Sequence, residues 1–405
     1  VRITHGRFVK LLESRDRRVR KDAFMGLYNT YNSFRNTLAA TYSANVKQEV
    51  FYTKARKYNS TLERALDANN IPVEVYTNLI EAVHKNMDLM YRYVRLRKKL
   101  LGLDEMHMYD LYTPLVPDIR MEIPYEEAKK IVEQGLQPLG EEYLAILREG
   151  FNNRWIDVYE NENKRSGAYS WGAYGTHPYV LLNYNDTLSN VFTLAHEMGH
   201  AIHSYYSDKT QPYRYAGYKI FVAEVASTCN EALLIDYLIK NTQDKKHKAY
   251  LVNHFLEKFR GTLYRQTMFA EFEMLTHRMA EKGESLTADA LCKLYHDLNV
   301  LYFGDDIVVD PEIDMEWARI PHFYNYFYVY QYATGFSAAI AISRRILEEG
   351  KPAVDDYIKF LSSGCSNYPI ELLKIAGVDM STTEPVNNAL QYFSELLDTM
   401  EELMS

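Results

Sequence analysis

The stretch TLAHEMGHAIHSYY, from Thr193 to Tyr206, places two histidines and a glutamate in the pattern HExxH. If the stretch is helical, His196 and His200 lie one turn apart on the same face, where their imidazoles can bind one zinc ion. Glu197 lies about 100° around the helix from His196, where it can reach a zinc-bound water without being a ligand. The pattern therefore predicts zinc-dependent hydrolysis with Glu197 as the general base.

A catalytic zinc ion usually has three protein ligands and one position for water, so a third ligand must come from elsewhere in the chain. The next helical pattern, FVAEVASTCNEALLIDYLI, carries Glu224 near its start, and we expect Glu224 to be that ligand. Glu231 follows seven residues later, about 20° away on a regular helix, and is suited to hydrogen-bond the back of a zinc-bound histidine. A solvated helix face is the alternative interpretation of both glutamates.

His203 also lies near this stripe, but it is about 10.5 Å along the helix axis from His196. The longer pattern HExxHxxGxxH fails as well, because it requires Gly and His where His203 and Tyr206 stand. We therefore expect His203 to have a structural role or to support the ligands from beside them. HExxH also arises by chance in on the order of one percent of chains of this length, so a helical binding protein with structural zinc or no zinc is the alternative.

The elements that must position these residues are mostly helical in pattern. Residues 8–101 are typical of long amphipathic helices interrupted by the turn DANNIP, and a region with three prolines, residues 103–124, follows them. A glycine-punctuated aromatic segment leads into a predicted strand at 179–184, just before the HExxH helix. We therefore predict a mainly α fold with a small β-hairpin beside that helix, a helical part at 1–120, and a catalytic helical part at 121–405. One stripe of the second long helix is expected to face the core: Val73, Tyr76, Leu79, Ile80, Val83, Met87 and Met90.

The composition excludes several classes of function. The net charge of −8 is spread along the chain, so nucleic-acid binding has no electrostatic support. No apolar run reaches the roughly 18 residues of a membrane span, and the first residues lack the apolar core of a secretory signal. The three cysteines, Cys229, Cys292 and Cys365, lie far apart without CxxC spacing and favour a reducing, cytoplasmic setting.

The segments HEMGHAIHS and FVAEVASTCNEALL resemble the thimet oligopeptidase and oligoendopeptidase F family of zinc metallopeptidases, with the oligoendopeptidase F branch closer. Further similar segments span nearly the whole chain, among them VRKDAFMGLYNTY, VFYTKARKYNSTLERAL, GAYGTHPYVLLNYNDT, IPHFYNYFYVYQYATGF and ELLKIAGVDM. The resemblance implies a large helical zincin-type body with a deep substrate cleft, one zinc ion per chain and short peptides as substrates. Family members usually have a longer segment ahead of the HExxH helix, so we expect their N-terminal lobe to be missing from this sequence.

The resemblance also implies roles for individual residues. His196, His200 and Glu224 match the family's zinc ligands, and Glu197 matches its base. The family's histidine and tyrosines near the scissile carbonyl correspond to His322, Tyr328 and Tyr332, with Tyr326 as a substitute and Gly335 where thimet oligopeptidase has a further tyrosine. The alternating tyrosines at positions 324–332 suit a strand, whereas the spacing of Tyr328 and Tyr332 also suits one face of a helix. For any single tyrosine, ordinary core packing is the alternative.

Gly175, His177 and Asn183 resemble the family's substrate-facing loop and strand beside the zinc. An open strand edge there can pair with an extended peptide backbone, whereas an ordinary buried hairpin is the alternative. The function predicted from all these residues is a zinc metalloendopeptidase that hydrolyses short peptides. A dipeptide-releasing carboxypeptidase of the same family is the nearest alternative within the enzyme class.

Overall fold

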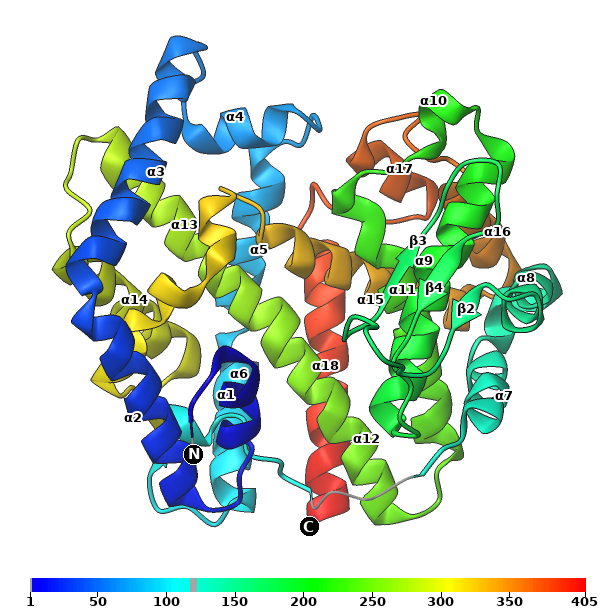
Figure 1. Cartoon of the computed structure of the whole chain (residues 1–405), viewed down its shortest axis with the longest axis horizontal. Coiled ribbons are helices and arrows are strands. Elements are labelled where there is room, and N and C mark those ends of the chain that lie inside the picture. The colour runs from blue at the N-terminus through cyan, green and yellow to red at the C-terminus, as the bar shows by residue number, and fades with distance from the viewer. Residues whose placement is uncertain (1, 117–121) are drawn as a thin grey trace.

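The computed structural model describes residues 2–116 and 122–405, and most of them lie in helices (Figure 1). The predicted mainly α fold is confirmed. The predicted boundary between residues 120 and 121 falls outside the described residues, and the division into two helical parts stays a prediction.

The helices of the described chain are separated by turns, loops and a few short strands. Those before the HExxH segment are α1 (His5–Leu12), α2 (Arg17–Ser33), α3 (Arg35–Ala55), α4 (Thr61–Asp67), α5 (Val73–Lys85), α6 (Met87–Leu100), α7 (Tyr125–Gly135) and α8 (Gly140–Asn152). The later ones are α9 (Leu188–Thr210), α10 (Tyr213–Ala216), α11 (Ile220–Asn241), α12 (Lys245–Lys258), α13 (Arg265–Glu281), α14 (Ala288–Phe303), α15 (Tyr330–Glu349), α16 (Lys351–Leu361), α17 (Pro369–Ile375) and α18 (Glu384–Met404). Short 3₁₀ or π segments are η1 (Met108–Asp110), η2 (Gln137–Leu139), η3 (Phe259–Tyr264), η4 (Pro311–Arg319) and η5 (Pro321–Tyr324).

The second long amphipathic pattern forms two helices, α5 and α6, rather than one. They meet at Asn86, whose side-chain amide donates to the Ala82 carbonyl at 2.8 Å. The predicted stripe nevertheless faces the core, because Val73 is half-buried and its other members are buried. Periodicity therefore predicted which face is buried but not where the helix is interrupted.

Helices far apart in the sequence lie side by side around the middle of the molecule. Figure 1 shows α2, α3, α13 and α14 on one side, and α7, α8, α9 and α11 with a small sheet on the other. Helix α15 packs against both α11 and α13. It therefore joins the two sides through one continuous apolar core.

The small sheet lies against α9, as predicted for the HExxH helix. Its strands have the order β2 (Ile156–Asp157), β4 (Tyr179–Leu181), β3 (Tyr169–Trp171), with β4 parallel to β2 and antiparallel to β3. Ser170 of β3 pairs with Val180 of β4, and both strands contact α9. A separate parallel pair joins β1 (Met106–His107) to β5 (Ile307–Val308).

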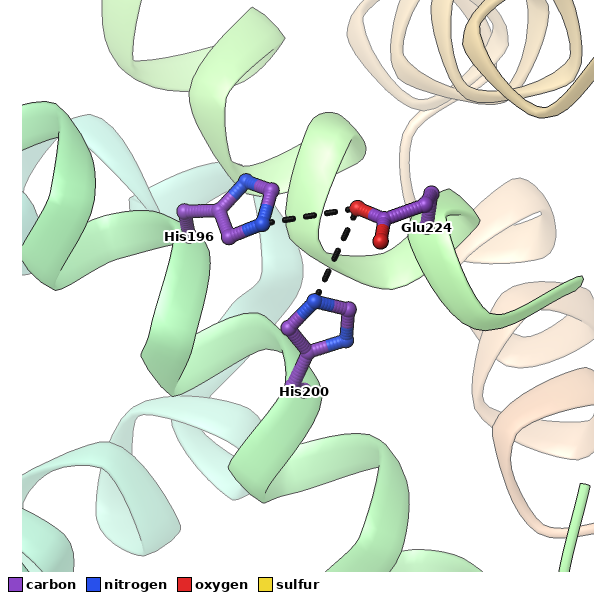
Figure 2. Close-up of side chains that lie close together, drawn as sticks. All are labelled: His196, His200 and Glu224. Atoms are coloured by element: carbon purple, nitrogen blue, oxygen red, sulfur yellow. Dashed lines mark ion pairs between the residues drawn. The ribbon is translucent and has the colours of Figure 1, made fainter. Parts of the chain in front are cut away.

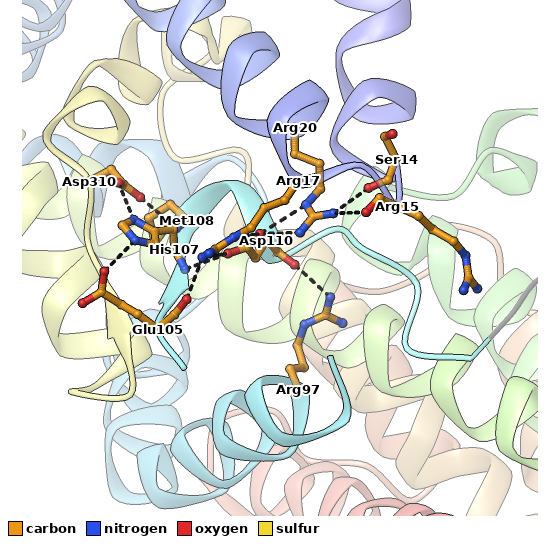
Figure 3. Close-up of polar contacts among 10 residues, drawn as sticks. All are labelled: Ser14, Arg15, Arg17, Arg20, Arg97, Glu105, His107, Met108, Asp110 and Asp310. Atoms are coloured by element: carbon orange, nitrogen blue, oxygen red, sulfur yellow. Dashed lines mark hydrogen bonds and ion pairs between the residues drawn. The ribbon is translucent and has the colours of Figure 1, made fainter. Parts of the chain in front are cut away.

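A buried polar network fixes the start of α2 to distant segments (Figure 3). The Asp110 carboxylate accepts hydrogen bonds from Arg20 at 2.6 Å and from Arg17 at 2.9 Å. His107 contacts Asp310, ahead of η4, at 2.8 Å. Of the arginines at the start of α2, Arg20 is therefore used inside the protein, because it is only 3% exposed and Asp110 is fully buried.

The last two features of the fold are the state of the cysteines and the apolar character of the helices. Cys229, Cys292 and Cys365 are free thiols. Within residues 2–116 and 122–405, no helix combines the length and the apolar character that crossing a bilayer requires.

Candidate metal centre

The HExxH segment lies in the interior of α9. The helix begins after Thr187, whose side-chain hydroxyl accepts a hydrogen bond from the backbone N–H of Asn190 at 3.2 Å and so caps the first turn. His196 and His200 are one turn apart, and their ring centroids are 4.9 Å apart. The helix therefore presents both imidazoles on one side, as the spacing predicted.

A close approach of α11 to α9 places Glu224 opposite these histidines. A Cβ on Gly199 would lie 2.6 Å from the Cα of Ser227, so only glycine allows the two backbones this separation. The side chain of Asn230 donates to the Ala195 carbonyl at 3.0 Å and links the same two helices. Residues 199 and 230 thus determine how far Glu224 lies from the histidines.

The side chains of His196, His200 and Glu224 converge on one point (Figure 2). Glu224 Oε2 lies 3.4 Å from His196 Nε2 and 3.6 Å from His200 Nε2. Two zinc bonds of 2.0–2.1 Å at a tetrahedral angle separate their ligand atoms by about 3.4 Å. The donors and their spacing therefore fit a zinc ion, and this trio is the only such group among the residues that the structure describes.

Both histidines have their second ring nitrogen engaged. Nδ1 of His196 donates to Oε1 of Glu231, as the seven-residue spacing predicted, and a ring N–H of His200 donates to the Ala223 carbonyl. In the neutral imidazoles the remaining lone pair then lies on Nε2, facing Glu224. A cation between these acceptor atoms would remove their mutual repulsion, which fits a metal site.

Glu231 is in turn held by Lys258, the last residue of α12, whose ammonium donates to Oε2. Burial raises the pKa of Glu231, but Lys258 and His196 outweigh it and bring the pKa down to about 2. The carboxylate behind His196 is thus charged and oriented from both sides.

Glu197 lies beside the ligands and is 7% exposed. Its carboxylate accepts a hydrogen bond from the backbone N–H of Ser170 in β3. Burial, reinforced by Glu224 and Glu231, raises its pKa to about 7, although His196 and the Ser170 N–H act in the opposite direction. A carboxylate with this pKa can take up and release a proton near neutral pH.

His203 does not join the ligands. Its ring is 1% exposed and stacks on Tyr218 with centroids 3.8 Å apart. Burial lowers its pKa to about 3, so it is a neutral packing residue. The structure thus places His203 in the core rather than toward the metal ligands.

The tyrosine-rich segment forms a 3₁₀ turn and the start of α15 rather than a strand. His322 and Tyr328 have nearly parallel rings with centroids 5.9 Å apart, and Tyr332 contacts both rings at 6.0 and 5.5 Å. Burial and Tyr328 raise the pKa of Tyr332, and Glu224 contributes to the same shift. Tyr332 therefore lies within electrostatic range of the candidate ligand Glu224, and His322 and Tyr328 gather around its ring.

Tyr326 lies apart from that group. Its ring contacts the Arg64 guanidinium at 4.9 Å and the His277 ring at 6.2 Å. Gly335 lies on α15 against Glu224, and a Cβ there would be 3.8 Å from the Glu224 Cβ. The structure brings Tyr328 and Tyr332 together with His322, and it does not bring Tyr326 there.

The residues expected to contact substrate stabilise the hairpin. His177 stacks on Trp155 with centroids 5.8 Å apart, and Asn183 donates to the carbonyls of Arg165 and Gly167. Gly175 has a positive φ of 85° at an exposed position. Their contact with substrate stays a prediction.

Two residues that shape the site, Gly199 and Lys258, were not predicted from the sequence. Gly199 is the glycine of HEMGH, and a glycine inside a helix is a weak sign of close packing. Lys258 lies 27 residues after Glu231 on another helix, and no spacing rule connects the two.

Comparison with known proteins gives three concordant results. A model of peptidase family M3 matches residues 10–392. Oligopeptidase PepF of Bacillus subtilis (strain 168) is 58% identical over 402 residues, which are 99% of this chain and 60% of PepF. Group B oligopeptidase PepB of Streptococcus agalactiae is 45% identical over 405 residues, which are 100% of this chain and 67% of PepB.

A solved structure is similar over the same range. The crystal structure of oligoendopeptidase-F from Enterococcus faecium superposes with a TM-score of 0.82 at 41% identity, covering 100% of this chain and 67% of that one. The chain described here thus spans about two thirds of these relatives' length.

Proposed function

The chain belongs to peptidase family M3, and from this premise we propose that it is a zinc-dependent endopeptidase that hydrolyses short peptides. The observation that carries the proposal is the convergence of His196, His200 and Glu224 beside the buried carboxylate of Glu197. Three protein donors match a catalytic zinc site, in which the fourth position belongs to water, with one ion per chain. The relatives' names, oligopeptidase and oligoendopeptidase, support short peptides as substrates. The free thiols support a cytoplasmic location.

In the proposed mechanism His196, His200 and Glu224 hold the ion, and Glu231 keeps His196 in the tautomer that ligation requires. Bound zinc would supply a Lewis acid that polarises water and the scissile carbonyl. Glu197 accepts the proton of the attacking water and then delivers it to the amine that leaves. The raised pKa of Glu197 supports both transfers near neutral pH.

His322, Tyr328 and Tyr332 have the donors that the developing oxyanion needs. We assign them hydrogen bonds to that oxygen, where loss of one donor commonly costs about 10²-fold or more in rate. Their ring contacts with one another and the influence of Glu224 on the pKa of Tyr332 support this assignment. The deep cleft expected around them stays a prediction.

Metal analysis combined with mass spectrometry of a mixed-peptide digest tests the function directly. The purified chain is expected to carry one zinc ion and to cut internal bonds of short peptides, including peptides with blocked C-termini. Chelation should stop the cleavage. A chain that bound no zinc, or that only released dipeptides from free C-termini, would contradict the proposal.

The third ligand is tested by Glu224→Ala. This variant should lose most of its zinc while its helix content stays unchanged. Glu371→Ala is a matched control, because Glu371 is an exposed helical glutamate paired with Lys374 and distant in sequence from the candidate ligands. Unchanged zinc content in Glu224→Ala would remove Glu224 from the ligand set.

A further inference from the structure

Phe327 has an unusual backbone conformation directly before Tyr328. Its φ of +53° lies in the left-handed region, which bulky side chains rarely adopt. It falls between η5, which carries His322, and α15, which carries Tyr332. Such a conformation persists only where the surrounding structure holds it.

Glu273 on α13 holds the backbone of Phe327 in this conformation through a hydrogen bond. Its side chain is fully buried, and Oε1 accepts a hydrogen bond from the Phe327 N–H at 3.0 Å. Oε2 has no hydrogen-bond partner, and Glu273 forms no ion pair, among the residues that the structure describes. Burying a carboxyl group without a cation nearby costs free energy. The hydrogen bond from the Phe327 N–H is the main polar contact that the buried Glu273 carboxyl group gains.

The ring of Phe327 is held from the same helix. Its centroid lies 4.7 Å from the ring of His277, one turn after Glu273 on α13, and 5.5 Å from the ring of Tyr76 on α5. Helix α13 thus contacts both the backbone and the side chain of the strained residue. Burial raises the pKa of Glu273 well above its ordinary value, which favours the neutral carboxyl group, close in shape to an amide.

We propose that Glu273 is a positioning residue for peptide hydrolysis, which fixes Phe327 in its left-handed conformation and thereby sets Tyr328 and Tyr332 against His322. The inference rests on the proposed function, in which those three aromatic residues stabilise the oxyanion. Among the residues that the structure describes, the Glu273 carboxyl group accepts a hydrogen bond from the Phe327 backbone and from none of the candidate ligands or the aromatic trio. Its effect on the reaction passes through the backbone of the turn.

The test compares substitutions that keep or remove the acceptor for the Phe327 N–H. Glu273→Gln keeps an oxygen at that place, Glu273→Met removes it at similar volume, and Glu273→Asp withdraws it by one methylene. Glu271→Met is the matched control, because Glu271 is a buried glutamate of the same helix that accepts from Tyr302 at 2.8 Å and does not touch the turn. Each variant is measured for kcat, KM, zinc content and amide hydrogen exchange in residues 322–332.

Glu273→Met should lower kcat about 10- to 100-fold, as a misplacement of about 1 Å does, while KM and zinc content remain unchanged. Exchange in the turn should become faster. Glu273→Gln should stay close to wild type, and Glu271→Met should keep both kcat and slow exchange in the turn. If Glu273→Met does not fold, Glu273→Asp is compared with Glu273→Gln instead. In that comparison kcat should fall in Glu273→Asp and stay close to wild type in Glu273→Gln.

The inference is overturned if removal of the acceptor leaves kcat or the exchange in the turn unchanged. It is also overturned if Glu273→Gln loses as much kcat as Glu273→Met, or if Glu271→Met loses as much. A wild-type chain that cleaves no peptide would instead refute the proposed function. The exchange measurement would then decide by itself whether Glu273 holds the turn.

Discussion

Gly199 and Ser227 bring α9 and α11 so close together that a Cβ at position 199 would stand 2.6 Å from the Ser227 Cα. Because the clashing atom belongs to the backbone of α11, it cannot rotate out of the way as a side chain could. Gly199→Ala should therefore push α11 away from α9. We expect a loss of stability of about 1–3 kcal/mol and weaker zinc binding, since Glu224 moves with α11. Thermal unfolding and chelator competition measure the two effects. Gly6→Ala, where no atom lies within 4 Å of the new Cβ, is the control, and equal behaviour of the two variants would refute the argument.

Lys258 should influence zinc affinity without touching the ion. Lys258→Met removes the cation that holds Glu231, so the carboxylate is less well fixed against His196. Loss of such a supporting partner typically lowers metal affinity about 10- to 100-fold. Lys240→Met removes another contact between a lysine and a carboxylate, the one with Asp236 on α11, and should leave the zinc affinity unchanged. Equal zinc dissociation constants for Lys258→Met and wild type would contradict the role of Lys258.

The aromatic trio should affect catalysis and not metal binding. His322→Ala and Tyr332→Phe each remove one donor of the aromatic trio, and each should lower kcat about 10²-fold with zinc content unchanged. Tyr324→Phe is the control, because the Tyr324 hydroxyl contacts Thr41 instead. Steady-state kinetics and metal analysis on the same samples measure both effects. A loss of zinc in Tyr332→Phe would show that Tyr332 supports the ligands rather than the oxyanion.

Acid should destabilise η4, the segment ahead of His322 that carries Glu316. Burial raises the pKa of Glu316, but Arg265 and Tyr295 outweigh it and bring the pKa down to about 2. A carboxylate whose pKa is lowered in the folded state stabilises the protein fully above its unfolded pKa, about 4.3, and loses this contribution as the pH falls toward 2. Tm of the wild type should therefore fall between pH 5 and 3 more steeply than Tm of Glu316→Gln. Parallel Tm curves would contradict this assignment.

The pairwise arrangement of the candidate ligands and of Glu231 could be predicted because it depends on spacing within single helices. His196 and His200 lie one turn apart, and Glu224 and Glu231 lie two turns apart, so helix geometry alone places each pair on one face. The small sheet beside α9 could be predicted from its glycine-punctuated pattern. These features need no knowledge of how distant elements pack.

The remaining parts of the site depend on such packing. Lys258 reaches Glu231 only because α12 lies against α11, and sequence distance contains no sign of this contact. The tyrosine-rich segment alternates like a strand, yet Glu273 and His277 on α13 hold Phe327 in a left-handed turn. Tertiary contacts therefore override the local period there.

The central claim is that Glu197 carries the proton while His196, His200 and Glu224 hold the metal. Glu197→Gln, measured for zinc content and for turnover of a short peptide, tests it most directly. The amide keeps the size of the side chain and cannot act as a base. We predict wild-type zinc content with cleavage reduced about 10²-fold or more. Normal turnover by a zinc-loaded Glu197→Gln variant would contradict the account.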